Sequence, residues 1–427
     1  MQLTSSSFKH HPHFLLRIFF ILNVLLSTRF FSFVLIDKRT IQFIEIVVLG
    51  LLFCLCLFSN KKYTGLLKNN FNYLLIFTLT ASVPAYIYHD QAFYLSFYAS
   101  KVVIYLYIYK FLHIYNFKSN YVLKVLFYVG LIWTVIMIIQ SFTFPQIMFR
   151  NKALEIEEYI KRARGNIIRI RVSDVRFGVL LLFGYANVYF IKKNFLTYKL
   201  IFLAFSIYGI FLTGTRQLIF SILLLLIILY LTIEKNKIKK KYYKAALLLI
   251  VLVFVFIMFP ASSTSFEVLT NKTIEDLNDS NIRLLSGMFY FFEYWPENNP
   301  ILAYFFGNGF AHGQSDYGKE IMNYHWEVLG FYRADIGLIG AFNKFGLFYF
   351  LTYISIIYKF LKVNYAINFY YIKFFIIFLL ATSFTGANHL ESSPIIIIIT
   401  CLAFIIDKKK QFVFDKSKQS LANNNNK

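Results

Sequence analysis

The sequence predicts an all-α membrane protein with about twelve transmembrane helices and with both chain ends in the cytoplasm. Hydrophobic residues make up 58% of the 427-residue chain and charged residues only 15%, against about 25% charged residues in an ordinary soluble domain. A water-soluble fold of this size could not bury so much apolar surface, so lipid is the expected solvent for most of the chain.

The individual spans are predicted from apolar runs long enough to cross a hydrocarbon core of about 30 Å. Each run is expected to be a helix, because only a helix satisfies its own backbone hydrogen bonds within lipid. The first run contains Arg17 and is followed by no small-residue cleavage site, so we interpret it as a span rather than a signal peptide. The runs lie near 14–36, 41–58, 71–88, 93–115, 121–144, 175–191, 198–213, 216–233, 244–260, 336–358, 369–385 and 394–406.

Lysine-rich connections predict the orientation of these spans. With twelve spans, these connections all fall on the same side as both termini, and that side is expected to be the cytoplasm. The net charge of +23 is divided among the connections instead of forming one stripe, which argues against a nucleic-acid partner. The connections contain Lys61, Lys62, Lys68, Lys118, Lys124, Lys192, Lys193, Lys199, Lys235 to Lys244, Lys359, Lys362, Lys373 and Lys408 to Lys410.

We therefore predict a single polytopic membrane domain over residues 1–427, ending in a cytoplasmic tail at 407–427. Two of the predicted external segments are long. One is a basic loop at 145–174, and the other, at 261–334, is a large loop of 74 residues. A loop of this length on a compact domain is more often functional than idle.

The arginines are sorted by membrane face. Guanidinium groups hold phosphate oxygens in bidentate fashion, so this sorting predicts an external site for a phosphate or diphosphate. The alternative is that the arginines pair with Glu155, Glu157, Glu158 and Asp174, or bind lipid headgroups. Nine of the twelve arginines lie between residues 150 and 333, all on the predicted external side: Arg150, Arg162, Arg164, Arg169, Arg171, Arg176, Arg216, Arg283 and Arg333.

Four of these arginines stand at places that favour a pocket. Arg216 follows Gly214 and Thr215 in a tight turn between two spans, where its charge is expected to face a protein cavity. An ordinary snorkelling anchor is the alternative for Arg216. Arg169, Arg171 and Arg176 lie at i, i+2 and i+7 where the first external loop enters a span, so they could reach one pocket.

The layout resembles the O-antigen polymerase and ligase superfamily of bacterial surface-polysaccharide assembly. The similar features are the number of spans, a basic first external loop, an arginine-containing hairpin and a large external loop late in the chain. Trp326 stands where the ligase branch has a small polar residue, and the following Gly-x-x-Gly is one residue further on, which weakens a ligase assignment. The matching residues are Gly214-Thr215-Arg216, the stretch from Arg283 to Trp295 and Pro300, Gly307-Asn308-Gly309, His325-Trp326 and Gly337-Leu338-Ile339-Gly340.

This resemblance implies a membrane glycosyltransferase-like (GT-C) fold in the bacterial inner membrane. It implies polymerisation of undecaprenyl-diphosphate-linked oligosaccharide repeat units into O-antigen or capsular polysaccharide at the periplasmic face. A chain-length regulator and a flippase are the implied protein partners. No metal or cofactor is expected, and the sequence has no Asp-x-Asp motif outside the predicted spans.

Glycosyl transfer from a lipid diphosphate needs cations for the leaving diphosphate and a base for the attacking sugar hydroxyl. We predict that Arg216, Arg169, Arg171, Arg176 and Arg283 bind the diphosphate. The large loop offers several bases, of which His325 is favoured because it precedes the Gly-x-x-Gly motif that would hold the loop at the membrane surface. Asp335 and Glu327 are the next candidates, ahead of His312 and Glu320.

Two other functions stay open at the level of sequence. An O-antigen ligase would use the same chemistry. A lipid-linked oligosaccharide flippase or other transporter would explain the ionisable residues Glu45, Lys101, Lys344 and Glu391 in or beside spans. The transporter fits the long external loop and the dissimilar halves of the chain less well.

Overall fold

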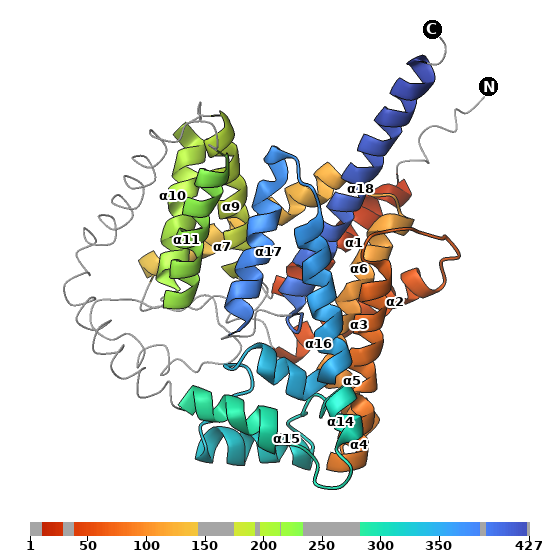
Figure 1. The fold of residues 1–427 in the computed structure, drawn as a ribbon, viewed down its shortest axis with the longest axis vertical. Coiled ribbons are helices and arrows are strands. Elements are labelled where there is room, and N and C mark those ends of the chain that lie inside the picture. Colours follow the sequence, from red (N-terminus) through yellow and green to blue (C-terminus); the bar gives the residue numbers. More distant parts are fainter. Residues whose placement is uncertain are drawn as a thin grey trace, which may run out of the picture.

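The computed structural model describes residues 11–28, 38–143, 175–192, 197–213, 215–233, 282–384 and 390–424. Within these ranges every regular element is a helix, and no strand is present. The helices form a bundle (Figure 1). The predicted basic loop at 145–174 and the predicted span at 244–260 lie outside the described residues.

Nine of the predicted spans each overlap a single helix in the structure, although residues 29–36 of the first predicted span lie outside the described residues. The last of them continues well beyond the predicted boundary, into the predicted cytoplasmic tail. The helices are α1 (His11–Thr28), α2 (Lys38–Leu57), α7 (Ser119–Thr143), α9 (Val175–Lys192), α10 (Thr197–Leu212), α11 (Arg216–Ile233), α16 (Leu338–Lys362), α17 (Tyr370–Ser383) and α18 (Ser393–Asn424).

Two further predicted spans are broken within the membrane domain. The run at 71–88 divides into α3 (Lys68–Thr80) and α4 (Ser82–His89), and Pro84 lies in the first turn of α4, where proline is tolerated. The run at 93–115 divides into α5 (Phe93–Ser100), the 3₁₀ helix η1 (Lys101–Leu106) and α6 (Tyr107–Ile114). Each pair or triplet is still continuous enough to act as one span.

Length and hydropathy identify an all-α membrane protein. Five helical segments are long and apolar enough to cross a membrane: Arg39–Leu57, Lys68–His89, Phe93–Ile114, Ser119–Thr143 and Leu338–Lys362. Shorter apolar helices of 10–17 residues accompany them at Phe14–Thr28, Val175–Ile191, Ile201–Leu212, Gln217–Ile233 and Ile367–Ser383.

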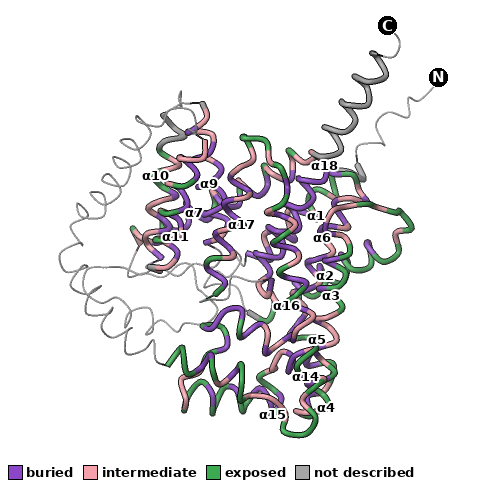
Figure 2. The backbone as a smooth tube through the Cα atoms, in the orientation of Figure 1, coloured by how far each residue is buried: buried purple, intermediate pink, exposed green. Residues whose placement is uncertain are grey.

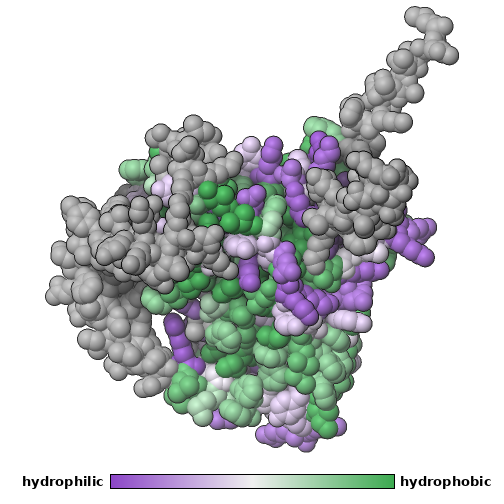
Figure 3. Space-filling model, turned by 45° about the horizontal axis from the view of Figure 1, so that its top comes forward, coloured by the Kyte–Doolittle hydropathy of each residue, from purple (hydrophilic) through white to green (hydrophobic). Residues whose placement is uncertain are grey.

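The outer surface of the bundle is apolar, as a lipid-facing surface should be. Phe43, Val47 and Leu51 recur along one face of α2 and are 68%, 45% and 51% exposed, which would be unfavourable in water. Hydrophobic side chains form a broad surface in Figure 3, and hydrophilic ones gather toward the end that carries the C-terminal helix.

Contacts between distant segments define two opposite ends of the bundle. Asp407 follows the buried apolar run of α18 and accepts a hydrogen bond from the Leu66 amide (3.1 Å). The next residue, Lys408, donates to Asn116 (2.8 Å). Lys359 on α16 donates to Asn70 on α3. We call this the lysine-rich end. At the opposite end lie α4, α14 (Ile301–Phe306) and α15 (Asp316–Glu320) (Figure 1).

The core of the bundle is built around α18. Every residue from Ile395 to Ile406 on this helix is buried, and α18 contacts α1, α6, α7, α9 and η1. A helix that is apolar on all sides is typical of a protein core or a membrane span. Because this run has no polar face, its sequence pattern does not show that it lies at the centre of the bundle. Figure 2 shows buried residues along α18 and in the adjoining helices.

Helix α16 is kinked at Gly346, which has φ 75° and ψ −173°. The amides of Asn308 and Gly309 donate to the carbonyls of Asn343 and Lys344 just before the kink, both at 2.8 Å. Non-helical backbone at membrane depth is tolerated only where other protein groups satisfy it. The segment after α14 therefore completes the hydrogen bonding of α16 and docks against it.

Replacing Gly346 by alanine should destabilise the protein, because this φ/ψ region is essentially restricted to glycine and costs other residues about 1–3 kcal/mol. A Cβ atom at Gly346 would also clash with the Phe305 carbonyl oxygen. Thermal unfolding of the detergent-purified chain measures the effect. The matched control is Gly50→Ala on α2, where an added Cβ meets nothing within 4 Å; equal melting temperatures for the two variants would contradict the prediction.

Candidate functional site

The described part of the large loop, residues 282–334, forms a layer at the end opposite the lysine-rich end (Figure 1). A helix over 282–288 leads into the π-helix η2 (Phe289–Glu293), and α15 leads into the π-helix η3 (Ile321–Val328). π-helical turns are rare and occur frequently at functional sites. Here η2 carries Tyr290 and η3 carries His325, whose side chains contact each other.

Gln91 fixes the loop onto the turn between α4 and α5. Its buried side-chain amide donates to Ser96 and to the Phe310 carbonyl, both at 2.6 Å. Its carbonyl oxygen accepts from the His312 amide (2.8 Å) and from the Ser315 hydroxyl (2.7 Å). Because Ser315 also caps α15 by accepting from the Gly318 amide, Gln91 positions the start of the segment that carries Glu320 and His325.

Asn343 fixes η2 from the other side. Its side-chain amide donates to the carbonyls of Tyr290 (2.9 Å) and Tyr294 (3.1 Å). Asn308 donates to the Tyr294 carbonyl as well (3.2 Å). The position of both tyrosine rings is thus set by α16 and by the segment that completes its kink.

His325 lies in the interior of this layer and is 1% exposed. Its Nδ1 atom is 2.8 Å from the Tyr290 hydroxyl, and its Nε2 atom is 3.7 Å from the Glu320 carboxylate. Tyr294 packs edge-on against the imidazole and donates from its hydroxyl to Glu320 at 3.3 Å. The Glu320 side chain is 48% exposed, so it connects the buried imidazole to solvent.

Arg333 occupies a cage of three tyrosines. Its guanidinium carbon lies 5.2, 5.3 and 5.5 Å from the ring centres of Tyr290, Tyr294 and Tyr317, within range of cation–π attraction. Nη2 donates to the Tyr317 hydroxyl at 2.9 Å. The ring of His89 stacks on Tyr317, with 4.0 Å between ring centres.

No carboxylate among the described residues balances the charge of Arg333. Arg333 is 4% exposed, and within the described ranges it makes no ion pair, while its Nε atom has no hydrogen-bond partner. Burying a charge costs several kcal/mol unless it is compensated, and cation–π contacts with three rings compensate only part of that cost. The cage is therefore a local positive centre that favours an anion nearby.

Gly340 explains how Arg333 reaches this position. A Cβ atom at Gly340 would clash with the Arg333 carbonyl oxygen, so only glycine permits the close approach of α16 to this residue. The second glycine of the Gly-x-x-Gly motif thus supports the backbone of Arg333.

Burial and the nearby Arg333 charge lower the pKa of His325 to about 4. Burial raises the pKa of Tyr290 to about 12. Near neutral pH the imidazole and the phenol are therefore both uncharged, and Arg333 is the cation of the cage.

This pKa shift predicts acid-sensitive stability. The unfolded chain, in which the His325 pKa returns to about 6.5, binds a proton more readily than the folded chain. The stabilisation is fully present above pH 6.5 and is lost as the pH falls toward 4. We expect the melting temperature of His325→Gln to fall less than that of the native chain over this interval, measured by intrinsic fluorescence. Parallel curves would contradict the assignment.

The other sequence-predicted site residues lie elsewhere or outside the description. Glu327, Asp335 and Arg283 are exposed and separate from the cage. Arg176 is half-buried in the first turn of α9, and Arg216 begins α11. Arg169 and Arg171 lie outside the described residues. The structure thus brings His325 into contact with the cage, whereas Arg283, a predicted diphosphate ligand, is exposed away from it.

Sequence reasoning named Glu320 only as a lower-ranked candidate base, and it did not select Arg333 or the three tyrosines as site residues. Arg333 belonged to the face-sorted set of arginines, and Tyr290 and Tyr294 have i, i+4 spacing, but nothing in the sequence connects them with Tyr317. What marks Arg333 out is its burial without a carboxylate partner among the described residues, whereas five of the other eight arginines lie outside those residues. Within the described segments, no three His, Cys, Asp or Glu residues are grouped so that they could hold a metal ion.

Comparison with known proteins found no family model that matches the chain and no similar curated protein.

Proposed function

We propose that this chain is a membrane glycosyltransferase that polymerises undecaprenyl-diphosphate-linked oligosaccharide repeat units. In this proposal it works at the periplasmic face of the bacterial inner membrane and makes O-antigen or capsular polysaccharide. The observation that carries the proposal is the buried Arg333 cation, which has no counter-charge in the described part of the chain. It lies beside a neutral imidazole and a carboxylate that reaches solvent.

The cation suits the leaving group of such a reaction. As the acceptor hydroxyl oxygen bonds to the anomeric carbon, the bond between that carbon and the diphosphate oxygen breaks, and its electron pair leaves with the diphosphate. Negative charge then grows on the diphosphate. A fixed positive centre with little water around it stabilises that charge more strongly than an exposed one would.

The His325–Glu320 pair suits the proton transfer. The acceptor hydroxyl must lose its proton as it attacks, and a base must lie within hydrogen-bond reach of it. Glu320 is the member of the pair that faces solvent, so we assign proton acceptance to its carboxylate. His325 and Tyr294 hold that carboxylate in place, which modifies the prediction that His325 itself is the base.

Aromatic side chains around the cage suit a substrate that is part sugar and part lipid. Trp295 packs on Tyr304 with 4.5 Å between ring centres, and Trp326 stacks on Tyr332 at 5.8 Å. Tyr332 and Phe292 are exposed. Such groups bind sugar faces and also lie favourably in the headgroup layer of a membrane.

A transporter is the second candidate, and ion pairs within the spans favour it. Lys344 bonds to Glu391 beside the kink in α16, and Lys101 lies 3.5 Å from Glu45. Broken helices and intramembrane charges are common in transporters. Glu45 neutralises Lys101 and Glu391 neutralises Lys344, whereas no carboxylate of the described residues neutralises Arg333. The cage is therefore the better candidate for binding an anionic substrate.

Reconstitution tests the proposal. The full chain is placed in liposomes with lipid-linked repeat units isolated from cells that lack the gene. A polymerase produces a ladder of longer lipid-linked glycans and releases undecaprenyl diphosphate. A ligase produces no ladder and requires a lipid A core acceptor, and a transporter moves the substrate across the bilayer without consuming it. Either of these two results would replace the proposal.

A further inference from the structure

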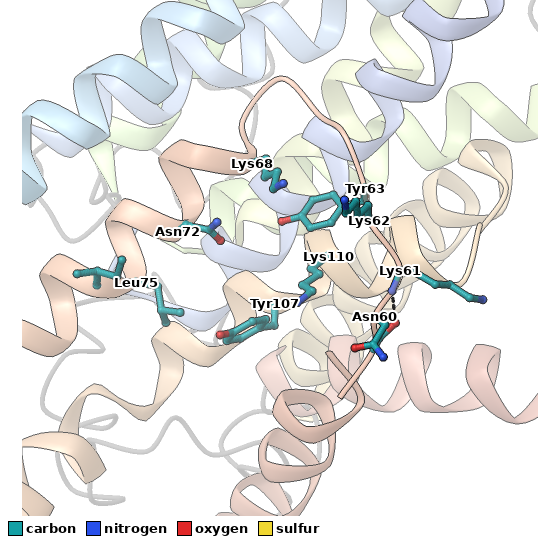
Figure 4. A pocket seen from close by; sticks show the side chains of 11 residues that line it. Asn60, Lys61, Lys62, Tyr63, Lys68, Asn72, Leu75, Tyr107 and Lys110 are labelled. Atoms are coloured by element: carbon teal, nitrogen blue, oxygen red, sulfur yellow. Dashed lines mark hydrogen bonds between the residues drawn. The ribbon is translucent and has the colours of Figure 1, made fainter. Parts of the chain in front are cut away.

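A polar cavity lies at the lysine-rich end, on the opposite side of the bundle from the tyrosine cage. It has a volume of about 480 Å³ and lies between the connection after α2, the start of α3 and the helix α6 (Figure 4). Its lining includes the four lysines Lys61, Lys62, Lys68 and Lys110 and the two tyrosines Tyr63 and Tyr107.

The connection that covers this cavity is held in a defined conformation. Asp407 accepts hydrogen bonds from the Leu66 amide (3.1 Å) and from the Tyr109 hydroxyl, and lies 3.3 Å from His113. The ring of Tyr63 packs against His113, with 5.5 Å between ring centres. Because Asp407 is fully engaged with these groups, it shapes the cavity without neutralising its lysines.

The cavity is strongly cationic. Four of its lining residues are lysines, and in the described part of the chain none of the four forms an ion pair. Lys68 instead lies 5.1 Å from the ring centre of Tyr63. An anionic group with several oxygens, such as a phosphate, would satisfy ammonium groups arranged in this way.

Polarity changes with depth along the wall that α3 provides. Lys68, Asn72 and the pair Leu75–Ile76 lie at i, i+4 and i+7/i+8 on one face of this helix. At 1.5 Å per residue, the apolar pair lies about 12 Å from Lys68 along the helix axis. On α6, the cavity is likewise lined by a charged residue, Lys110, and by a less polar one, Tyr107. A free anion would make no favourable contact with the apolar side chains of Leu75 and Ile76.

We propose that this cavity binds the headgroup of an anionic phospholipid in the leaflet at the lysine-rich end. The phosphate lies among Lys62, Lys68 and Lys110, and one acyl chain runs along Leu75 and Ile76 toward the hydrocarbon core. Ile76 is 49% exposed, so this path is open to lipid. The site is independent of the tyrosine cage and of the reaction proposed for it.

Titration of the detergent-solubilised full chain with short-chain phosphatidylglycerol, followed by native mass spectrometry, tests this site. Each lysine near a lipid phosphate contributes about fivefold to affinity, so Lys68→Gln with Lys110→Gln should raise the Kd about 25-fold. Lys62→Gln should raise the Kd about fivefold. Because Lys62 is exposed, this variant still tests the site if the double variant of Lys68 and Lys110 fails to fold. Lys68→Arg with Lys110→Arg should retain binding.

The matched control is Lys118→Gln with Lys124→Gln, two exposed lysines at the same end that lie outside the cavity. This pair should leave the Kd unchanged. Equal loss in the control pair would mean that surface charge alone attracts the lipid, and would overturn the proposal. Displacement of phosphatidylglycerol by inorganic phosphate at matched concentration would also overturn it, because the cavity would then be a site for a free anion.

Discussion

Replacing Arg333 by lysine should slow glycan extension, with kcat reduced about 100-fold or more. This is the usual cost of losing a group that stabilises transition-state charge. Lysine keeps the positive charge but loses the planar guanidinium that contacts three rings and bonds to Tyr317. The reconstituted polymerisation reaction, read as the glycan ladder, measures the loss. Arg39→Lys, on an exposed position of α2, should leave the ladder unchanged.

A second substitution separates a functional Arg333 from a structural one. Arg333→Met removes the charge and keeps an apolar chain of similar length. Replacing a buried charge by an apolar group is often neutral or stabilising, so the melting temperature should stay level or rise while activity is lost. If the melting temperature and the activity fell together, Arg333 would be a structural element of the loop, and the anion-binding role would be withdrawn.

The helices were accessible to sequence reasoning because lipid imposes a simple condition on them. Every predicted run other than 244–260 overlaps described helices, since a long apolar segment has no alternative to a helix in hydrocarbon. The interruptions were not anticipated. The non-helical turn at Gly346 depends on amides of residues 308 and 309, which lie far from it in sequence.

The site was accessible only in part. His325 was selected for its place before the Gly-x-x-Gly motif, and it does lie in a polar cluster. Which arginine accompanies it depends on burial and on the absence of a carboxylate, and neither is a property of local sequence. The i, i+4 pair Tyr290 and Tyr294 reads as an ordinary apolar face, and only the fold brings Tyr317 and Arg333 against it.

Replacing Glu320 by glutamine should lower kcat about 100-fold to 10,000-fold, the range expected for loss of a general base. Glutamine preserves the shape of the side chain and can still accept from Tyr294, so substrate binding, and hence KM, should change little. The rate of undecaprenyl diphosphate release at saturating substrate measures the effect. Glu297→Gln, an exposed carboxylate in the same loop, is the matched control and should retain activity.

The comparison with His325→Gln then assigns the roles within the pair. Glu320 is the exposed partner, and His325 touches it only from the buried side at 3.7 Å. If Glu320 accepts the proton, removing it costs more than removing the histidine that positions it, and the double variant is no slower than Glu320→Gln alone, because residues that act as a unit are not additive. Full activity in Glu320→Gln combined with an inactive His325→Gln would transfer the base role to the imidazole. That result would require the loop to open, since a ring that is 1% exposed cannot reach an acceptor hydroxyl in the conformation described.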